Sequence, residues 1–190
     1  MNDYVSKLMV AYIIKNDPTW AIHFFCSNGR DELVEDIIKT NPSVSVEYAR
    51  LVVKGRWEEA EKCISESHYD SRRYAQEVLK GRFPEYEKKI DKMPVEAVAY
   101  ACVIKKRTPF AEKHIIKGSI ENLFNYIRRV IKGRLPEAEE KIAKKPKWLF
   151  KYAEAINSKL PDELHAAMTM YSFSHPSDKN IKKYFAIYGK

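Results

Sequence analysis

The sequence is poor in the features that several common classes of protein require. Its 190 residues include 6 glycines and 9 prolines, too few for an all-β protein that depends on many tight turns. The longest apolar run is Ala97–Ile104, far shorter than the roughly 20 residues that a membrane-spanning helix needs. The first residues, Met1–Tyr4, lack the basic region and apolar stretch of a secretory signal. We therefore expect no contact with a membrane.

Motifs for metal binding and catalysis are also missing. The three cysteines, Cys26, Cys63 and Cys102, are too widely spaced for a zinc site or a disulfide framework. Scattered thiols of odd number are typical of a reducing cytoplasm, where they would serve core packing. The five histidines form no i, i+4 pair with one another or with a cysteine, and no phosphate-binding glycine loop or nucleophile elbow is present. We therefore expect a cytoplasmic protein with no metal, no cofactor and no enzymatic activity.

Apolar and charged residues are abundant. Hydrophobic residues make up 45% and aromatic residues 12% of the chain, which favours a folded core over disorder. The net charge of +8 is unevenly distributed, because residues 1–100 carry 15 basic and 17 acidic side chains whereas residues 101–190 carry 19 and 9. The excess positive charge therefore lies in the C-terminal half.

A repeat of about 26 residues organises the chain. Lys-Gly-Arg occurs at 54–56, 80–82 and 132–134, and weaker versions end at Arg30 and Arg107. A degenerate sixth copy has Lys159 in the place of the arginine. An isoleucine follows each of the five arginines by eight residues, and a glutamate follows each by five. These glutamates are Glu35, Glu61, Glu87, Glu112 and Glu139.

Each repeat predicts two short helices joined by tight turns. Val46–Val53 spaces its apolar residues three and four apart, as a helix does, and Gly55 is expected to supply the left-handed residue that ends it. Pro84 and Pro136 lie two residues past the repeated arginine, which suits the first turn of a second helix. Such short helices are marginal alone and must stack on their neighbours. The sequence therefore predicts an all-α fold, an α-solenoid of about six two-helix repeats with a C-terminal capping helix.

The repeat array is expected to form a single domain over residues 1–172. Residues 173–190 are expected to form a linker and the capping helix, which would pack on the array. The cap is predicted at Ser177–Ile187, with Ile181, Tyr184, Phe185 and Tyr188 on its apolar side.

One copy of the repeat resembles a known kind of sequence. Lys80–Ile90 reads Lys-Gly-Arg-Phe-Pro-Glu-Tyr-Glu-Lys-Lys-Ile and follows Tyr74-Ala75. It resembles short helical repeats in proteins of large tailed bacteriophages and giant viruses, and is distantly similar to tetratricopeptide hairpins and related α-solenoid repeats. The resemblance covers roughly residues 10–170. It implies an α-solenoid and a viral origin, and it brings no catalytic residues.

The repeated arginines and glutamates allow three interpretations. They could form a ladder of ion pairs, the arginines could bind the carbonyl groups at the end of the first helix, or the arginines could line a basic edge. We favour the first two, because a feature that recurs in every copy is most simply explained by the fold. The recurring isoleucines and valines, with Tyr48, Tyr74 and Tyr126, are expected in the core.

Functional residues are then expected where the copies depart from the repeat. Basic clusters interleaved with aromatic residues suit phosphate contact and base stacking. The alternative is a solvated helix face with its aromatic residues turned inward. The candidate binding residues are Arg72, Arg73, Lys105, Lys106, Arg107, Arg128, Arg129, Lys144, Lys145, Lys147, Lys151 and Trp148.

Two functions fit these features. The first is an interaction module that docks a protein partner, as an adaptor or as an inhibitor of a host factor if the chain is viral. The second is a nucleic-acid binder with little sequence preference that uses the basic C-terminal half. The sequence leaves the oligomeric state open.

Overall fold

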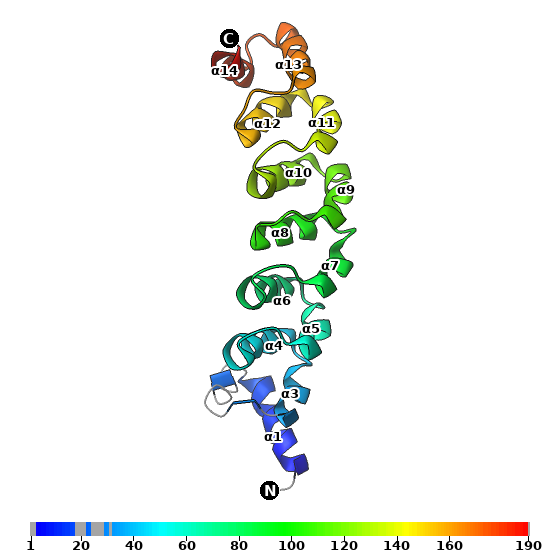
Figure 1. Ribbon diagram of the computed structural model, residues 1–190, viewed down its shortest axis with the longest axis vertical. Coiled ribbons are helices and arrows are strands. Elements are labelled where there is room, and N and C mark those ends of the chain that lie inside the picture. Colours follow the sequence, from blue (N-terminus) through cyan, green and yellow to red (C-terminus); the bar gives the residue numbers. More distant parts are fainter. Residues whose placement is uncertain (1–2, 18–21, 24–28, 31, 190) are drawn as a thin grey trace. The chain divides into compact units, whose positions relative to one another are not determined.

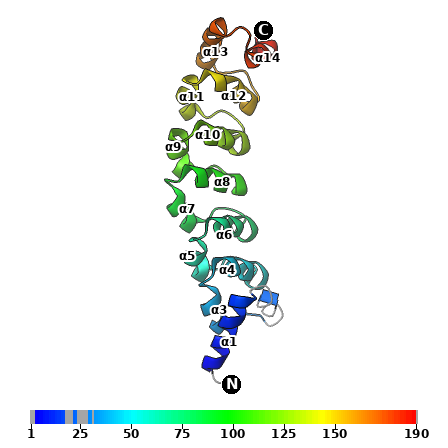
Figure 2. The same cartoon turned by 180° about the vertical axis from the view of Figure 1, so that it is seen from behind.

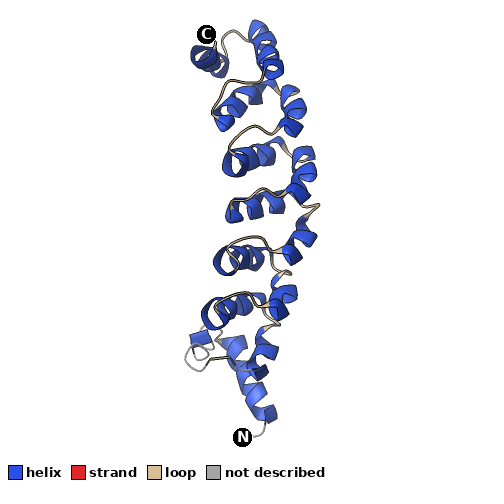
Figure 3. Cartoon of the chain, in the orientation of Figure 1, coloured by secondary structure: helices blue, strands red, loops and turns tan. Residues whose placement is uncertain are grey.

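Figure 1 shows the computed structural model of the chain, which describes residues 3–17, 22–23, 29–30 and 32–189. Within these residues every regular element is a helix (Figure 3), and the predicted all-α helical-repeat fold is confirmed. None of the described helices is both long enough and apolar enough to cross a membrane. The chain forms two compact units, Met1–Asp91 (unit 1) and Lys92–Lys190 (unit 2), which are described in turn.

Unit 1 consists of stacked helical hairpins. Helix α4 packs against α3, α5 and α6, and the ends of the first helices, η1 and η2, also touch. Both ends are π-helical turns that continue α4 and α6. The elements are α1 (Asp3–Asn16), α3 (Glu32–Ile38), α4 (Pro42–Tyr48), η1 (Ala49–Val53), α5 (Glu58–Ile64), α6 (His68–Arg73), η2 (Tyr74–Val78) and α7 (Pro84–Ile90).

Unit 2 repeats the arrangement in two layers of helices (Figures 1 and 2). The first helices of the hairpins, α8, α10 with η3, α12 and α14, pack side by side in one layer. The second helices, α9, α11 and α13, form the other. The elements are α8 (Pro94–Ile104), α9 (Pro109–Lys117), α10 (Ile120–Tyr126), η3 (Ile127–Ile131), α11 (Pro136–Ala143), η4 (Pro146–Trp148), α12 (Leu149–Ile156), α13 (Asp162–Ser174) and α14 (Lys179–Tyr188).

The residue that ends the first helix is not the predicted glycine. Lys54 adopts the left-handed conformation, with φ 56°, and Gly55 does not. The cause is the π-helical last turn, in which the Lys54 N–H bonds to the Ala49 carbonyl and closes the helix one residue before the glycine. The π-helical turn η3 ends in the same way at Lys132, whose N–H bonds to the Ile127 carbonyl, whereas α8 and α12 end at a left-handed residue without a π-helical turn. Among the described residues, the left-handed residues that are not glycine are Lys54, Lys80, Lys105, Lys132 and Asn157.

The core follows the repeat closely, with one exception. The isoleucines of the repeat are fully buried, and so are tyrosines spaced 26 residues apart: Tyr48, Tyr74, Tyr100, Tyr126 and Tyr152. The valines predicted for the core are only half-buried, because they lie in the last turn of the first helix beside its exposed terminal lysine. These are Val52, Val78, Val103 and Val130. Pro84 and Pro136 begin second helices, as predicted.

The repeated arginine and glutamate pair with each other inside each repeat. Every guanidinium binds both carboxylate oxygens, at nitrogen–oxygen distances of 2.5–3.1 Å. The arginine side chains remain about half exposed, whereas the glutamates are nearly buried. The pairs are Arg30–Glu35, Arg56–Glu61, Arg82–Glu87, Arg107–Glu112 and Arg134–Glu139. The repeated arginines therefore form the ion pairs of the first interpretation above, and each pair lies within one repeat.

A buried tyrosine of the next repeat completes this network. The Tyr152 hydroxyl donates to Glu139 at 2.8 Å and accepts the Leu135 N–H at 3.0 Å. Tyr126 does the same with Glu112 and with Thr108, at 2.6 and 2.9 Å. Burial raises the pKa of Tyr126 to about 12, so the hydroxyl stays protonated and able to donate. Tyr126 and Tyr152 thereby tie their helices to the hairpin before each of them.

The C-terminal hairpin varies this network and carries the cap. The Tyr184 hydroxyl of α14 lies 3.3 Å from the Leu160 nitrogen, and it contacts Nδ1 of His165 at 2.7 Å, whereas Tyr126 and Tyr152 contact a glutamate. Ile181 and Tyr184 are buried against the array, and Lys183 pairs with Glu154 of α12. Helix α14 thus covers the end of the first layer of unit 2.

Candidate functional site

Several of the predicted binding residues are held by acidic neighbours. Arg73 pairs with Glu47 of the preceding repeat and with Glu77. Arg107 belongs to the repeated network, and Lys144 pairs with Glu140 at 2.6 Å. These cations are already neutralised within the fold and are weaker candidates for binding.

The other predicted residues differ in surroundings. Lys105 ends α8 in the left-handed conformation, and Lys106 follows it on an exposed turn. Arg72 is half-buried in α6 of unit 1. Burial raises the pKa of the Cys102 thiol, and the nearby positive charge of Arg129 partly lowers it again. None of these four candidates lines the cavities described below.

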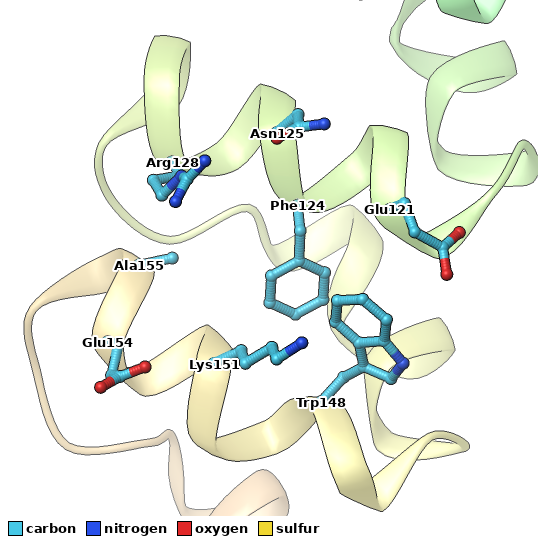
Figure 4. Close-up of a pocket in the computed structure, with 8 residues that line it drawn as sticks. All are labelled: Glu121, Phe124, Asn125, Arg128, Trp148, Lys151, Glu154 and Ala155. Atoms are coloured by element: carbon cyan, nitrogen blue, oxygen red, sulfur yellow. The ribbon is translucent and has the colours of Figure 1, made fainter.

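The structure brings three predicted residues together in one cavity of unit 2, here called the groove. It lies between α10–η3 and η4–α12 and has a volume of about 380 Å³ (Figure 4). Arg128, Trp148 and Lys151 belong to the prediction. The groove is lined by Glu121, Phe124, Asn125, Arg128, Trp148, Lys151, Glu154 and Ala155.

An aromatic pair lies against the groove. The rings of Phe124 and Trp148 are 4.8 Å apart at an angle of 40°, and Phe124 is 8% exposed. Pro146 begins the short 3₁₀ turn η4, whose last residue is Trp148, and this turn brings the indole next to α10. The Lys151 ammonium lies 4.2 Å from the centre of the indole ring, a cation–π contact. Trp148 therefore presents its remaining surface between a phenyl ring and a cation.

Charges of both signs surround these rings (Figure 4). Arg128 is exposed and forms no ion pair or hydrogen bond with any residue that the structure describes. Glu121 is also exposed, and Glu154 pairs with Lys183 at 3.0 Å. The groove thus contains the guanidinium of Arg128, here called open because no described residue pairs with it, the Lys151 ammonium over the Trp148 indole, and carboxylates at its margins.

In unit 1 the positions equivalent to Asn125 and Arg128 of the groove carry opposite charges. Taking the buried tyrosines as the register, Glu47 and Arg50 correspond to Asn125 and Arg128. In unit 1 Glu47 binds Arg50 three residues later in the same helix. The arginine at this position therefore has a partner in unit 1, whereas Asn125 offers no charge to Arg128.

A second cavity of about 290 Å³, here called the lysine pocket, adjoins the groove through Trp148. Tyr171 and His175 stack on each other there, with ring centres 4.0 Å apart. The pocket is lined by Lys144, Lys145, Pro146, Lys147, Trp148, Tyr171 and His175. Four predicted residues, Lys144, Lys145, Lys147 and Trp148, thus meet in it.

Unit 1 holds a larger depression of about 570 Å³, but its charges belong mainly to the fold. Arg30 and Glu35 in its wall form one of the repeated pairs, and Lys39 pairs with Asp36. Its one aromatic residue, Trp57, is 1% exposed. This depression lacks an accessible aromatic surface and is not a comparable binding site.

Sequence reasoning missed part of the groove. The lining residues that were not predicted are Glu121, Phe124, Asn125, Glu154 and Ala155. One signal was available for Asn125: it immediately precedes a tyrosine of the 26-residue series, at the position of Glu47. Comparison of this position between the copies shows that Asn125 has an amide where Glu47 has a carboxylate.

Among the described residues, no group of three or more histidine, cysteine, aspartate or glutamate side chains is placed to hold a metal ion. Comparisons with protein-family models, with curated proteins and with solved structures gave no match to this chain.

Proposed function

We propose that this chain is a non-enzymatic helical-repeat module that docks a segment of a protein partner in the groove of unit 2. The observation that carries the proposal is the open Arg128 beside the Phe124–Trp148 pair. Arginine and tryptophan are, with tyrosine, the residue types most enriched at the energetic centres of protein interfaces. Helical-repeat proteins bind partners on surfaces built from successive repeats, and the groove is built from two.

The size and chemistry of the groove support a peptide-like occupant. Its volume of about 380 Å³ lies within the range of about 300–1,000 Å³ typical of ligand cavities. Aromatic surface can bury an apolar side chain, and the flanking charges can fix its orientation. If the chain is viral, as the sequence resemblance implies, such a module would act as an adaptor or as an inhibitor of a host factor.

Nucleic-acid binding is the second candidate, and the lysine pocket favours it. Lys145 and Lys147 are exposed there beside the stacked rings of Tyr171 and His175. Lysines beside aromatic rings suit a single-stranded backbone with its bases stacked. The groove is less suited to this ligand, because Glu121 and Glu154 would repel phosphates.

A selection experiment tests the docking proposal. Random peptides displayed on yeast are selected for binding to the wild-type chain and then tested against Trp148→Ala and Ala155→Arg. Ala155 lines the groove, so an arginine there would obstruct it without removing the aromatic pair. Selected peptides are expected to lose binding to both variants. Peptides that bind wild type and both folded variants equally would show that the groove is not the docking site.

Fluorescence anisotropy tests the second candidate. Labelled single-stranded RNA and duplex DNA are titrated at about 50 and 200 mM salt, because contacts to several phosphates weaken by orders of magnitude over this range. Salt-sensitive binding that is lost in Lys145→Glu with Lys147→Glu would favour the nucleic-acid function. No binding at the lower salt would exclude it.

A further inference from the structure

We propose that the segment docked in the groove is acidic, with a carboxylate paired to Arg128 and an apolar side chain packed on Phe124 and Trp148. This inference rests on the proposed docking function and names the chemistry of the partner. The missing carboxylate at position 125 is its starting point.

In unit 1 every charged side chain at the equivalent positions is paired with one of opposite charge. Glu47 binds Arg50 in its own helix and Arg73 in the next repeat, 26 residues later. Glu77 lies 3.3 Å from Arg73 and 3.6 Å from Arg50. Two carboxylates and two guanidinium groups therefore form a closed network between consecutive first helices.

In unit 2 the same positions leave an excess of positive charge. Asn125 stands in the place of Glu47, and Lys151 stands in the place of Arg73. Arg128, in the place of Arg50, is left without a carboxylate among the described residues. The positions of both unit 1 carboxylates, Glu47 and Glu77, are occupied in unit 2 by Asn125 and Ala155, and a carboxylate of a partner could take their place beside Arg128.

The net charge of unit 2 as a whole also favours an acidic partner. Unit 2 contains 20 basic and 10 acidic residues, whereas unit 1 contains 14 and 16. A net charge of +10 on one compact unit attracts an acidic segment over a range of about 10 Å at moderate salt. The electrostatic attraction draws the acidic segment to unit 2, and an ion pair with Arg128 would fix its position in the groove.

A peptide fits the groove better than a phosphate backbone does. Glu121 and Glu154 stand at the margins, and a peptide can place a neutral residue opposite each of them. A nucleic acid carries a charge at every nucleotide and cannot avoid them. The Trp148 ring already contacts Phe124 and Lys151, which restricts stacking of a base but leaves room for a smaller apolar group at its edge.

The decisive variant is Asn125→Glu, which restores within unit 2 the carboxylate that unit 1 has. The new carboxylate would stand three residues before Arg128, as Glu47 stands before Arg50, and would occupy its guanidinium. Lys113→Gln is the matched control: it also makes the net charge more negative by one, and Lys113 is an exposed residue of α9, outside the groove.

The probe is a fluorescein-labelled synthetic peptide with one phenylalanine flanked by alternating aspartate and serine. Two counterparts carry lysine or asparagine in place of aspartate. Binding of each is measured by anisotropy to the full chain. We expect the acidic peptide to bind preferentially, Asn125→Glu to weaken it about tenfold as for the loss of one interfacial charge pair, and Lys113→Gln to leave it within about twofold.

The outcomes separate this inference from the docking function. Equal binding of the acidic peptide to wild type and Asn125→Glu would overturn the acidic-partner inference. Preferential binding of the lysine or asparagine peptide, lost in Ala155→Arg, would also overturn it but would support docking in the groove. If no peptide binds and single-stranded RNA does, both the inference and the docking function are wrong.

Discussion

Replacing Tyr152 by phenylalanine removes one hydroxyl that joins two consecutive hairpins of unit 2. The hydroxyl donates to Glu139 at 2.8 Å and accepts the Leu135 N–H at 3.0 Å, and the side chain is fully buried. A hydrogen bond to a charged group contributes about 1.5–3 kcal/mol, and a buried N–H left without an acceptor costs about 1–3 kcal/mol. Glu139 keeps its contacts with Arg134, so we expect a net loss of about 2–4 kcal/mol in unfolding free energy.

Urea unfolding followed by far-UV circular dichroism measures this loss. The matched control is Tyr69→Phe, the same chemical change at a side chain that is 64% exposed. The control should change the unfolding free energy by less than about 0.5 kcal/mol. A Tyr152→Phe effect as small as that of the control would refute the view that the tyrosine hydroxyls hold the repeats together.

Three further predictions concern the repeat. Arginine hydrogen bonds lower the pKa of the carboxyl groups of Glu35 and Glu139, so the stability that they contribute is present above the unfolded pKa of about 4.3 and is lost as the pH falls through the lower folded value. The urea midpoint should therefore decrease between about pH 5 and pH 3, and a constant midpoint would contradict the network. Lys132→Gly should raise the unfolding free energy by about 1 kcal/mol, because Lys132 holds a left-handed φ of 53°, and a decrease would show that its side chain has another role. In thermal unfolding Arg134→Gln should lower the transition temperature and Arg128→Gln should not, since Arg134 alone is paired; equal effects would disprove this difference.

Much of the fold could be predicted because its signals are local and repeated. The interval of five residues between arginine and glutamate places both at the start of a second helix, and the structure pairs them in the five copies that have the arginine. Helical periodicity and the positions of proline predicted the hairpins in the same way. The left-handed residue was predicted wrongly at Gly55, because periodicity gives no sign of the π-helical turn that closes at Lys54.

The site was less predictable, because the environment of a charge depends on the neighbouring repeat. The basic clusters were visible in the sequence, but Arg73 and Arg107 proved to be paired while Arg128 is open. Phe124 belongs to the groove because the 3₁₀ turn before α12 places Trp148 against its ring, and this contact could not be predicted from the sequence.

The sequence by itself therefore determined the repeat and its all-helical class, because both follow from spacing along one or two helices, and it left the partner of the repeated arginines open. The tertiary structure decided which tyrosine completes each ion pair and which cations remain open. Those contacts join different helical elements, as the Tyr152 hydroxyl accepts the backbone N–H of Leu135 17 residues away and the Glu47 carboxylate binds Arg73 26 residues away. Stacking decides which of these side chains face one another, and so the open Arg128 and the groove beside it become visible only when the helices are packed.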